Sequence, residues 1–148
     1  MSFIVAEVGI NHNGSLKITE KLIEEAAKAG CDAVKFQNYQ TEDFIKDKKL
    51  IYTYISKGKK ISESQFEMFK RYEIDFNFLC EAKNICDKNN IEFLSTPTSK
   101  KGVDDLVKLG CKKVKNGSDF LDNLSLINHM RQSGMDVIIS TGMAYKEQ

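Results

Sequence analysis

The sequence predicts an α/β protein with a parallel sheet, and three features of its 148 residues support this prediction. Short apolar runs of strand length alternate with amphipathic helical patterns along the chain. A Gly or Asn stands before most of the runs, where it fits the left-handed residue that ends a helix. The alternation of β and α segments implies parallel strands joined by right-handed crossovers.

The first predicted strand lies in the stretch FIVAEVGINHNG, at 3–14, where an apolar run contains Glu7 and ends in a polar turn. Four later segments repeat one pattern of Gly or Asn, a short apolar run and polar residues. These segments are 29–37, 89–97, 109–118 and 133–142. The apolar runs show little alternation, which is typical of strands covered on both faces.

A helical pattern precedes each of the four later segments. In 15–29 the residues Ile18, Leu22 and Ala26 share one face, and in 75–89 an apolar stripe follows Asp75, which is placed to cap the helix. Two further stripes predict the remaining helices. They are Val103, Leu106 and Val107, and then Leu124, Ile127 and Met130.

The segment 38–74 departs from this rhythm. It is rich in lysine and tyrosine, and SESQ at Ser62 has the pattern of a capping box that opens a short helix. A connection of this length in an α/β domain is often a functional excursion at one end of the sheet. A solvated loop with a packing helix explains it equally well.

Composition excludes several classes of function. The net charge is +1, and Arg71 and Arg131 are the only arginines, so the sequence predicts no nucleic-acid partner and no membrane surface. The four cysteines form no CxxC pair, which argues against a zinc site or a disulfide framework. The N-terminus lacks the pattern of a signal peptide, and no apolar run is long enough to span a bilayer. We therefore expect a cytoplasmic protein.

Polar side chains gather where the predicted strands end. In parallel sheets these carboxyl ends share one edge, and chemistry concentrates there. The residues at this edge are Glu7, Lys35, Gln37, Thr96, Lys115 and Ser118, followed by Ser140 and Thr141. Two lysines with hydroxyls and a Gly-containing turn favour a site for a phosphate or a carboxylate.

Glu7 stands inside an apolar run, where an unpaired carboxylate is costly. The sequence leaves two roles open for it. It can form a structural ion pair with Lys35 on the next strand, or it can act in proton transfer or hold a sugar hydroxyl. His12 fits a turn residue, and His129 lies on a helix with no evident partner.

Several motifs occur in the order seen in one enzyme family. They are AEVGINHNGSL, AGCDAVKFQ, IEFLSTP, VKNGSDFLDN and IISTGMA, and they cover nearly the whole chain. The chain thus resembles the sialic acid synthase family, which includes N-acetylneuraminate synthase and relatives that make legionaminic and pseudaminic acids. The resemblance implies a TIM barrel and, in the full-length enzyme, an antifreeze-like domain and a homodimer.

The resemblance also implies a reaction. The family condenses phosphoenolpyruvate with the open-chain aldehyde of an N-acetylated hexosamine such as N-acetylmannosamine, and phosphate leaves by C–O cleavage. Mn²⁺ or Mg²⁺ polarises the aldehyde, and the resemblance places the metal-binding histidines in later strands than this chain contains. These two small molecules are the expected substrates.

Carried over by position, the resemblance assigns roles to the residues of the predicted edge. Lys35, Thr96, Lys115 and Ser118 resemble the phosphoenolpyruvate ligands, Gln37 matches a sugar-contacting residue, and Glu7 matches the catalytic acid. Two positions depart from the family pattern. Phe120 stands where an acid holds sugar hydroxyls, with Asp119 beside it as a substitute, and Asn116 is polar where the family has an apolar residue.

The chain ends after the fifth predicted strand, whereas a closed barrel needs eight. We therefore expect residues 1–148 to be an N-terminal portion of a synthase, a truncated barrel of about five β-α units in sequential order and incomplete for catalysis. Three alternatives remain. They are a free-standing flavodoxin-like domain, another phosphoenolpyruvate-dependent 3-deoxy sugar acid synthase, and a non-catalytic fragment. Strand order tests the first, since a doubly wound sheet runs 2-1-3-4-5.

Overall fold

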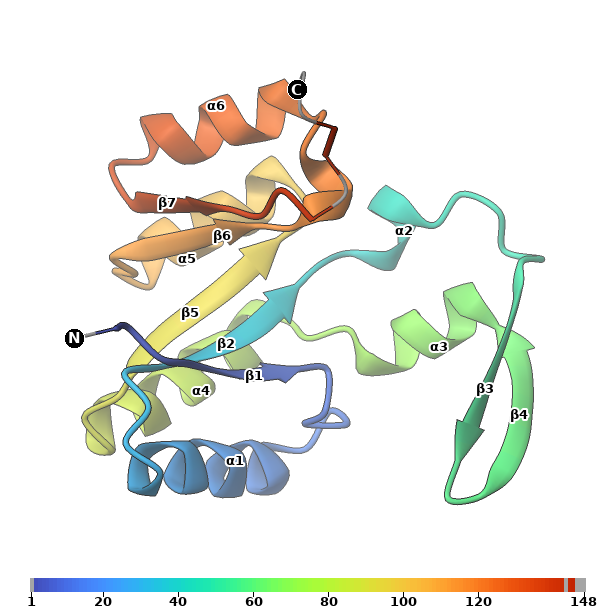
Figure 1. Cartoon of the computed structure of the whole chain (residues 1–148), viewed down its shortest axis with the longest axis horizontal. Coiled ribbons are helices and arrows are strands. Elements are labelled where there is room, and N and C mark those ends of the chain that lie inside the picture. The colour runs from blue at the N-terminus through green and yellow to red at the C-terminus, as the bar shows by residue number, and fades with distance from the viewer. Residues whose placement is uncertain (1, 143, 146–148) are drawn as a thin grey trace.

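The computed structural model describes residues 2–142, 144 and 145, and these form an α/β fold with parallel strands (Figure 1). In chain order the elements are β1 (Val5–Gly9), α1 (Leu16–Lys28), β2 (Ala33–Asn38), α2 (Thr41–Phe44), β3 (Ile51–Ser56), β4 (Lys59–Ser64), α3 (Gln65–Tyr72), α4 (Phe76–Lys88), β5 (Glu92–Pro97), α5 (Lys100–Lys108), β6 (Lys113–Asn116), the 3₁₀ turn η1 (Ser118–Phe120), α6 (Leu124–Gln132) and β7 (Asp136–Ile139).

The parallel strands lie side by side in the order of the sequence. β1 pairs with β2, β2 pairs with β5, and β6 pairs with β7, all in parallel. β6 lies next to β5, and Lys113 of β6 binds Glu92 of β5 with Nζ–Oε distances of 3.0 and 2.8 Å. In the doubly wound order β1 would lie between β2 and β5. The flavodoxin-like alternative is therefore wrong for this chain.

One apolar core fills the space between the strands and the helices. It joins Val34 and Phe36 of β2 and Phe93 of β5 to buried side chains from α1, α4, α5 and α6. The rings of Phe36 and Phe93 stack with their centroids 5.2 Å apart. Helices from four successive connections thus cover the same face of the strands, as right-handed crossovers in sequential order require.

The prediction that the strands are covered on both faces is confirmed for the central strands β2 and β5, where residues 33–36 and 93–97 are buried, and it is wrong for Glu7 of β1. Val8, Val34, Phe93 and Val114 point into the helical core, whereas the opposite face carries polar side chains such as Glu7 and Lys35. Glu7 keeps 52% of its side chain exposed. Within the described part of the chain β1 lies at the edge of its sheet and no helix covers Glu7, so the carboxylate remains in contact with water.

The predicted helices form, and their caps explain where they begin. Ser15, Asp75, Ser99 and Asn123 each accept a hydrogen bond from a backbone N–H three residues on. The predicted cap at Ser62 is wrong, because Ser62 lies within β4. Ser64 instead caps α3 by accepting from the N–H of Glu67, which shifts the Ser-x-x-Glu/Gln box by two residues.

The long segment 38–74 forms an antiparallel hairpin that the sequence did not predict. β3 and β4 pair from Ile51–Ser64 to Ser56–Lys59 through a two-residue turn at Lys57 and Gly58, both with positive φ. α3 holds the hairpin in place, because Arg71 binds both oxygens of Glu63 at 2.7 and 2.8 Å. The hairpin and α3 project beyond the carboxyl end of β2 (Figure 1).

No helix in the described part of the chain is both long and apolar enough to cross a membrane. All four cysteines are free.

Candidate functional site

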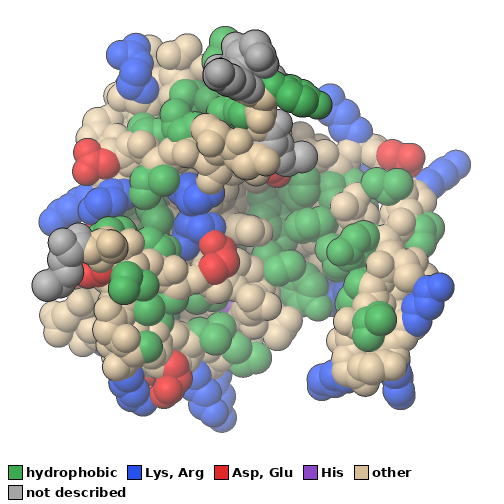
Figure 2. Space-filling model, viewed as in Figure 1, with side chains coloured by type: hydrophobic (Ala, Val, Ile, Leu, Met, Phe, Trp, Pro, Cys, Tyr) green, Lys and Arg blue, Asp and Glu red, His purple; other side chains and the backbone are tan. Residues whose placement is uncertain are grey.

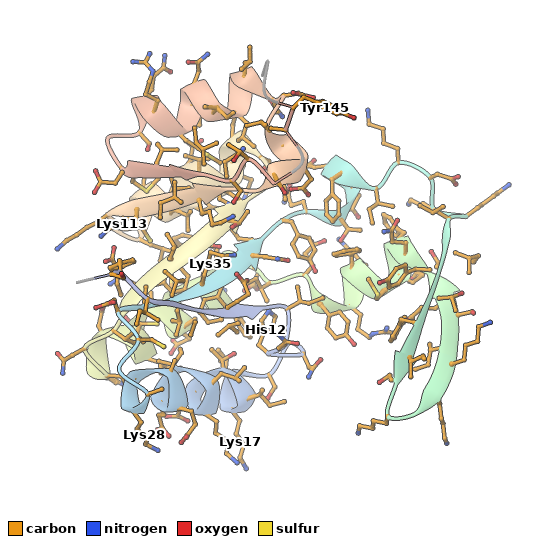
Figure 3. The ribbon with its side chains drawn as sticks, in the orientation of Figure 1. His12, Lys17, Lys28, Lys35, Lys113 and Tyr145 are labelled. Atoms are coloured by element: carbon orange, nitrogen blue, oxygen red, sulfur yellow. The ribbon has the colours of Figure 1, made fainter. Side chains whose placement is uncertain are left out.

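Three of the predicted site residues form one connected group on the open face of the sheet. Glu7 Oε2 lies 2.6 Å from Lys35 Nζ, and the same Nζ donates to Thr96 Oγ1 at 3.3 Å. The strand register explains this group, because Glu7 pairs with Lys35 across β1 and β2, and Thr96 lies two residues beyond Leu94, the partner of Lys35 on β5. Figure 3 shows Lys35 near the centre of this face.

Lys35 is buried while Glu7 is half exposed, with 7% and 52% of their side chains accessible. The ammonium therefore depends on Glu7 and Thr96 to replace its lost water. The structural ion pair that the sequence left open is present. It does not exclude a catalytic role, because the exposed half of the carboxylate still faces solvent.

Lys115 approaches the same group from β6. Burial lowers the pKa of its ammonium, and the positive charge of Lys35 lowers it further, while Glu7 and Asp119 act in the opposite direction. Its Nζ donates to the carbonyl of Asn116 at 3.3 Å. A half-buried ammonium that is destabilised by a neighbouring cation gains from any anion that binds between them.

Gln37 and Glu7 meet at Gly9, where β1 has a bulge. The register shifts between Glu7 and Gly9, and Gly9 adopts a φ of +53°. A Cβ at Gly9 would lie 3.2 Å from Glu7 Oε1 and 3.8 Å from Gln37 Nε2. The bulge thus allows both side chains to approach the end of β1, and bulges are common beside active sites.

Ser118 lies in η1, directly after β6. Gly117 brings this turn against Thr96, since a Cβ at Gly117 would lie 3.7 Å from Thr96 Cγ2. Ser118 also lies beside Gly142, whose hypothetical Cβ would be 3.9 Å from Ser118 Oγ. The six predicted residues therefore share one end of the sheet, although no direct contact joins Ser118 to Lys35 or Lys115.

The two positions that departed from the family pattern have distinct surroundings. Phe120 packs against the apolar core, so it cannot hold a sugar hydroxyl. Asp119 is exposed, and its charge acts on Lys115. Asn116 is fully buried and donates from Nδ2 to the carbonyl of Gly117 at 3.0 Å, which stabilises the turn that carries Ser118.

His12 is the residue whose importance the sequence pattern missed. It is completely buried between the rings of Phe36 and Phe78, with centroid distances of 6.2 and 5.1 Å (Figure 3). Its Nδ1 accepts a hydrogen bond from the N–H of Gly14 at 3.0 Å, and burial lowers its pKa. His12 therefore organises the turn after β1 as a neutral ring. His129, which had no evident partner, lies with Nε2 2.7 Å from Oδ1 of Asp104 on α5.

The described residues hold no cluster of three His, Cys, Asp or Glu side chains that could bind a metal ion. A cavity of about 370 Å³ lies on the helical side, between α3, α4 and α5, and none of the six predicted residues lines it. In Figure 2, cationic and acidic side chains lie next to each other near the middle of the viewed face.

Parallel strands with helices on one face, and polar side chains at their carboxyl ends, are the arrangement in which α/β proteins place their ligand sites. Comparison with known proteins gives the family. The chain belongs to the NeuB family, whose model matches residues 22–148. Its relatives include N-acetylneuraminate-9-phosphate, legionaminic acid and pseudaminic acid synthases, which are enzymes of sugar acid biosynthesis.

Three comparisons define the extent of the similarity. The chain is 39% identical to N,N'-diacetyllegionaminic acid synthase of Campylobacter jejuni over 97% of its own length and 43% of that enzyme. It matches the sialic acid synthetase structure of Leptospira borgpetersenii with a TM-score of 0.84 and 30% identity, over 98% of this chain and 46% of the other. A 3-deoxy-D-arabino-heptulosonate 7-phosphate synthase of Thermotoga maritima shares the fold alone, with a TM-score of 0.66 and 8% identity over 97% of this chain and 42% of the other. The chain thus spans less than half the length of these proteins.

Proposed function

We propose that this chain supplies the phosphoenolpyruvate-binding part of a synthase that condenses phosphoenolpyruvate with an N-acetylated hexosamine to give a sialic acid-type sugar. The observation that supports this most is the convergence of Lys35, Lys115 and Thr96 on one face, from three different strands. Family membership supports the reaction class, and the sequential strand order supports an arc of a TIM-type barrel.

The charges of the group fit a small anion with two acidic functions. Lys35 directs two of its three ammonium donors to Glu7 and Thr96, so its positive charge and its third donor serve the anion in this proposal. Lys115, whose pKa is lowered by burial and by Lys35, gains most from a bound phosphate or carboxylate. In this proposal Ser118 and the turn that follows β6 add hydrogen bonds to the same anion.

Glu7 is placed to serve the bond-forming step. The enol carbon of phosphoenolpyruvate would attack the aldehyde carbon, water would add to the adjacent carbon, and phosphate would leave. Glu7 would take up a proton from the adding water and pass it to the former aldehyde oxygen, which becomes a hydroxyl, since its carboxylate is exposed beside the proposed anion site. Gln37, across the bulge at Gly9, would contact the sugar. The divalent metal expected from the resemblance is not assigned to any described residues, and no step is routed through it.

Calorimetric titration with phosphoenolpyruvate tests the anion site. We expect Lys115→Ala to weaken binding at least about tenfold, because a charge-assisted contact is lost. Lys113→Ala is the matched control. Lys113 lies on the same strand and face but pairs with Glu92 at the opposite end (Figure 3), so its loss should leave the affinity within about twofold. Equal weakening by both variants, or no binding by the wild type, would overturn the proposal.

A further inference from the structure

The β3–β4 hairpin has an unused edge. Among the described residues β3 pairs only with β4, and the two strands form a separate two-stranded sheet. The hairpin stands clear of the body of the molecule in the space-filling view (Figure 2). An exposed edge strand presents free N–H and C=O groups that can pair with another strand.

The register fixes which backbone groups are free. Gln65 N–H donates to the carbonyl of Leu50, and the two-residue turn makes Ser56 and Lys59 the other end of the ladder. Hydrogen-bonded and non-hydrogen-bonded pairs alternate along antiparallel strands. The residues of β3 between the bonded positions, which are Ile51, Thr53 and Ile55, therefore direct their N–H and C=O groups outward.

The same three residues carry an exposed apolar face. Ile51 is 61% exposed and Ile55 is 78% exposed, and Thr53 between them bonds the hydroxyl of Ser62 at 2.8 Å. Tyr52 and Tyr54 point to the other face, where their rings stack at 5.7 Å and Tyr54 donates to Glu63. The exposed isoleucines have no cover from α3, because α3 is tied to Glu63 on the tyrosine face.

The strand is also self-complementary. Residues 51–55 read Ile-Tyr-Thr-Tyr-Ile, which is identical in both directions about Thr53. An antiparallel pair with a two-fold axis at Thr53 would place Ile51 opposite Ile55, Tyr52 opposite Tyr54, and Thr53 opposite itself. Opposite residues share a face in such a pair, so isoleucines would meet isoleucines and tyrosines would meet tyrosines.

We propose that the outer edge of β3 pairs antiparallel with β3 of a second copy of this chain, with the two-fold axis at Thr53, to form a continuous four-stranded sheet. In this register the outward N–H and C=O groups of residues 51, 53 and 55 form hydrogen bonds with the same groups of the second copy. The proposal is independent of the function proposed above.

The size and charge of this edge determine the strength of the contact. A five-residue strand covers far less than the roughly 1,200–2,000 Å² of a stable interface, so the contact is weak and depends on concentration. Basic residues flank the neutral strand at the hairpin tip and base. They are Lys57, Lys59 and Lys60 at the tip, and Lys46, Lys48 and Lys49 at the base. Tip and base of opposite copies approach each other, so salt that screens their repulsion strengthens the dimer.

Sedimentation equilibrium over a range of concentrations tests the proposal. We expect reversible dimerisation whose dissociation constant falls when NaCl is raised from about 0.05 M to about 0.5 M. Thr53→Lys places two like charges at the two-fold axis and should weaken the dimer at least about tenfold. Ser62→Lys is the matched control, since it removes the same hydroxyl contact and adds the same charge to the same face on β4, which is the outer strand of the proposed sheet. It should leave most of the affinity.

Cross-linking tests the register. In a Cys31→Ser, Cys80→Ser background, Thr53→Cys should form dimers with a short bismaleimide, whereas Ser62→Cys should form few. A protein that stays monomeric at all concentrations would overturn the proposal. So would a dimer that Thr53→Lys leaves intact, or one that cross-links equally at both positions, because each places the contact elsewhere.

Discussion

At the scale of single residues, the turn that ends β1 determines how Glu7 is presented. Gly9 combines a bulge, a positive φ and close approach to both Glu7 and Gln37. An alanine there would adopt a left-handed conformation and would press its Cβ against the carboxylate. The sequence of this strand, an apolar run that contains Glu7, indicates neither the left-handed conformation of Gly9 nor the lack of space for a Cβ there.

We expect Gly9→Ala to lower the free energy of unfolding by more than the roughly 1–2 kcal/mol that the left-handed conformation alone costs. Urea denaturation measures this change. Gly30→Ala is the matched control, because Gly30 has a φ of +79° but no atom within 4 Å of the added Cβ. If both variants lose the same stability, the contact with Glu7 contributes nothing.

His12 gives the protein a predictable response to acid. Burial lowers its pKa below the ordinary value of 6.5, so the folded protein binds this proton less readily than the unfolded chain. The contribution of the neutral ring is therefore complete above about pH 6.5 and is lost as the pH falls below that value. Protonation would also place a charge between Phe36 and Phe78.

We expect His12→Gln to reduce the dependence of the thermal midpoint on pH between about pH 7.5 and about pH 5. The variant begins with a lower midpoint, because it loses the ring contacts. Only the slope of the midpoint against pH decides the prediction. Identical slopes for the wild type and the variant would mean that His12 does not couple folding to pH in this range.

At the scale of elements, α5 approaches the sheet more closely than its sequence indicates. Gly102 lies in the first turn of the helix, and a Cβ there would be 2.9 Å from Pro97 Cβ and 3.0 Å from Asn38 Nδ2. The carbonyl of Gly102 accepts a hydrogen bond from this Asn38 amide at 3.1 Å, and Asn38 Oδ1 accepts one from Ser95. The glycine thus joins α5 to the ends of β2 and β5.

Gly102→Ala should destabilise the protein by about 1–3 kcal/mol through overpacking. In an unconstrained helix the same change would stabilise it by up to about 1 kcal/mol, so the sign of the effect is informative. Chemical denaturation measures it. Val107→Ala on the exposed side of α5 serves as control, since 46% of Val107 is accessible and its truncation should cost much less. A stabilised Gly102→Ala variant would show that the helix can move away.

At the scale of the whole molecule, the core and the hairpin differ in what holds them. β2 lies between β1 and β5, and its residues from Ala33 to Phe36 are buried. β3 and β4 have mostly exposed residues and are tied to α3 mainly by polar contacts such as the Arg71–Glu63 pair. Local opening is easiest where few buried apolar contacts oppose it.

Hydrogen exchange should therefore separate the two regions. We expect the amides of β2 and β5 to exchange only through global unfolding, and those of β3 and β4 to exchange several orders of magnitude faster. Mass spectrometry of peptic fragments measures this at low protein concentration, where contacts between copies are negligible. Equal protection of both regions would show that the hairpin unfolds together with the core.

The sequence by itself determined the alternation of strands and helices, the family, and the edge of the sheet to which the polar residues belong. This was possible because strand and helix periodicity and helix caps are local, and because parallel strands end at a common edge. Lys35, Thr96 and Lys115 could be assigned to that edge by counting along strands. The β3–β4 hairpin could not be predicted from the sequence, because its strands carry exposed isoleucine and tyrosine and have no buried face that would mark them as strands.

The family resemblance predicted the sequential strand order, which the structure confirms, and only the tertiary structure decided the exposure of Glu7 and the way Glu7, Lys35 and Thr96 combine. Strand order depends on contacts between residues that are far apart in the chain. No local sequence pattern therefore distinguishes the sequential order β1-β2-β5 from the doubly wound order β2-β1-β5. The coverage of a strand depends on which neighbour packs over it, so the apolar run around Glu7 predicted burial that an edge position does not provide. The importance of His12 likewise arises from Phe36 and Phe78, which the fold brings to it from separate elements.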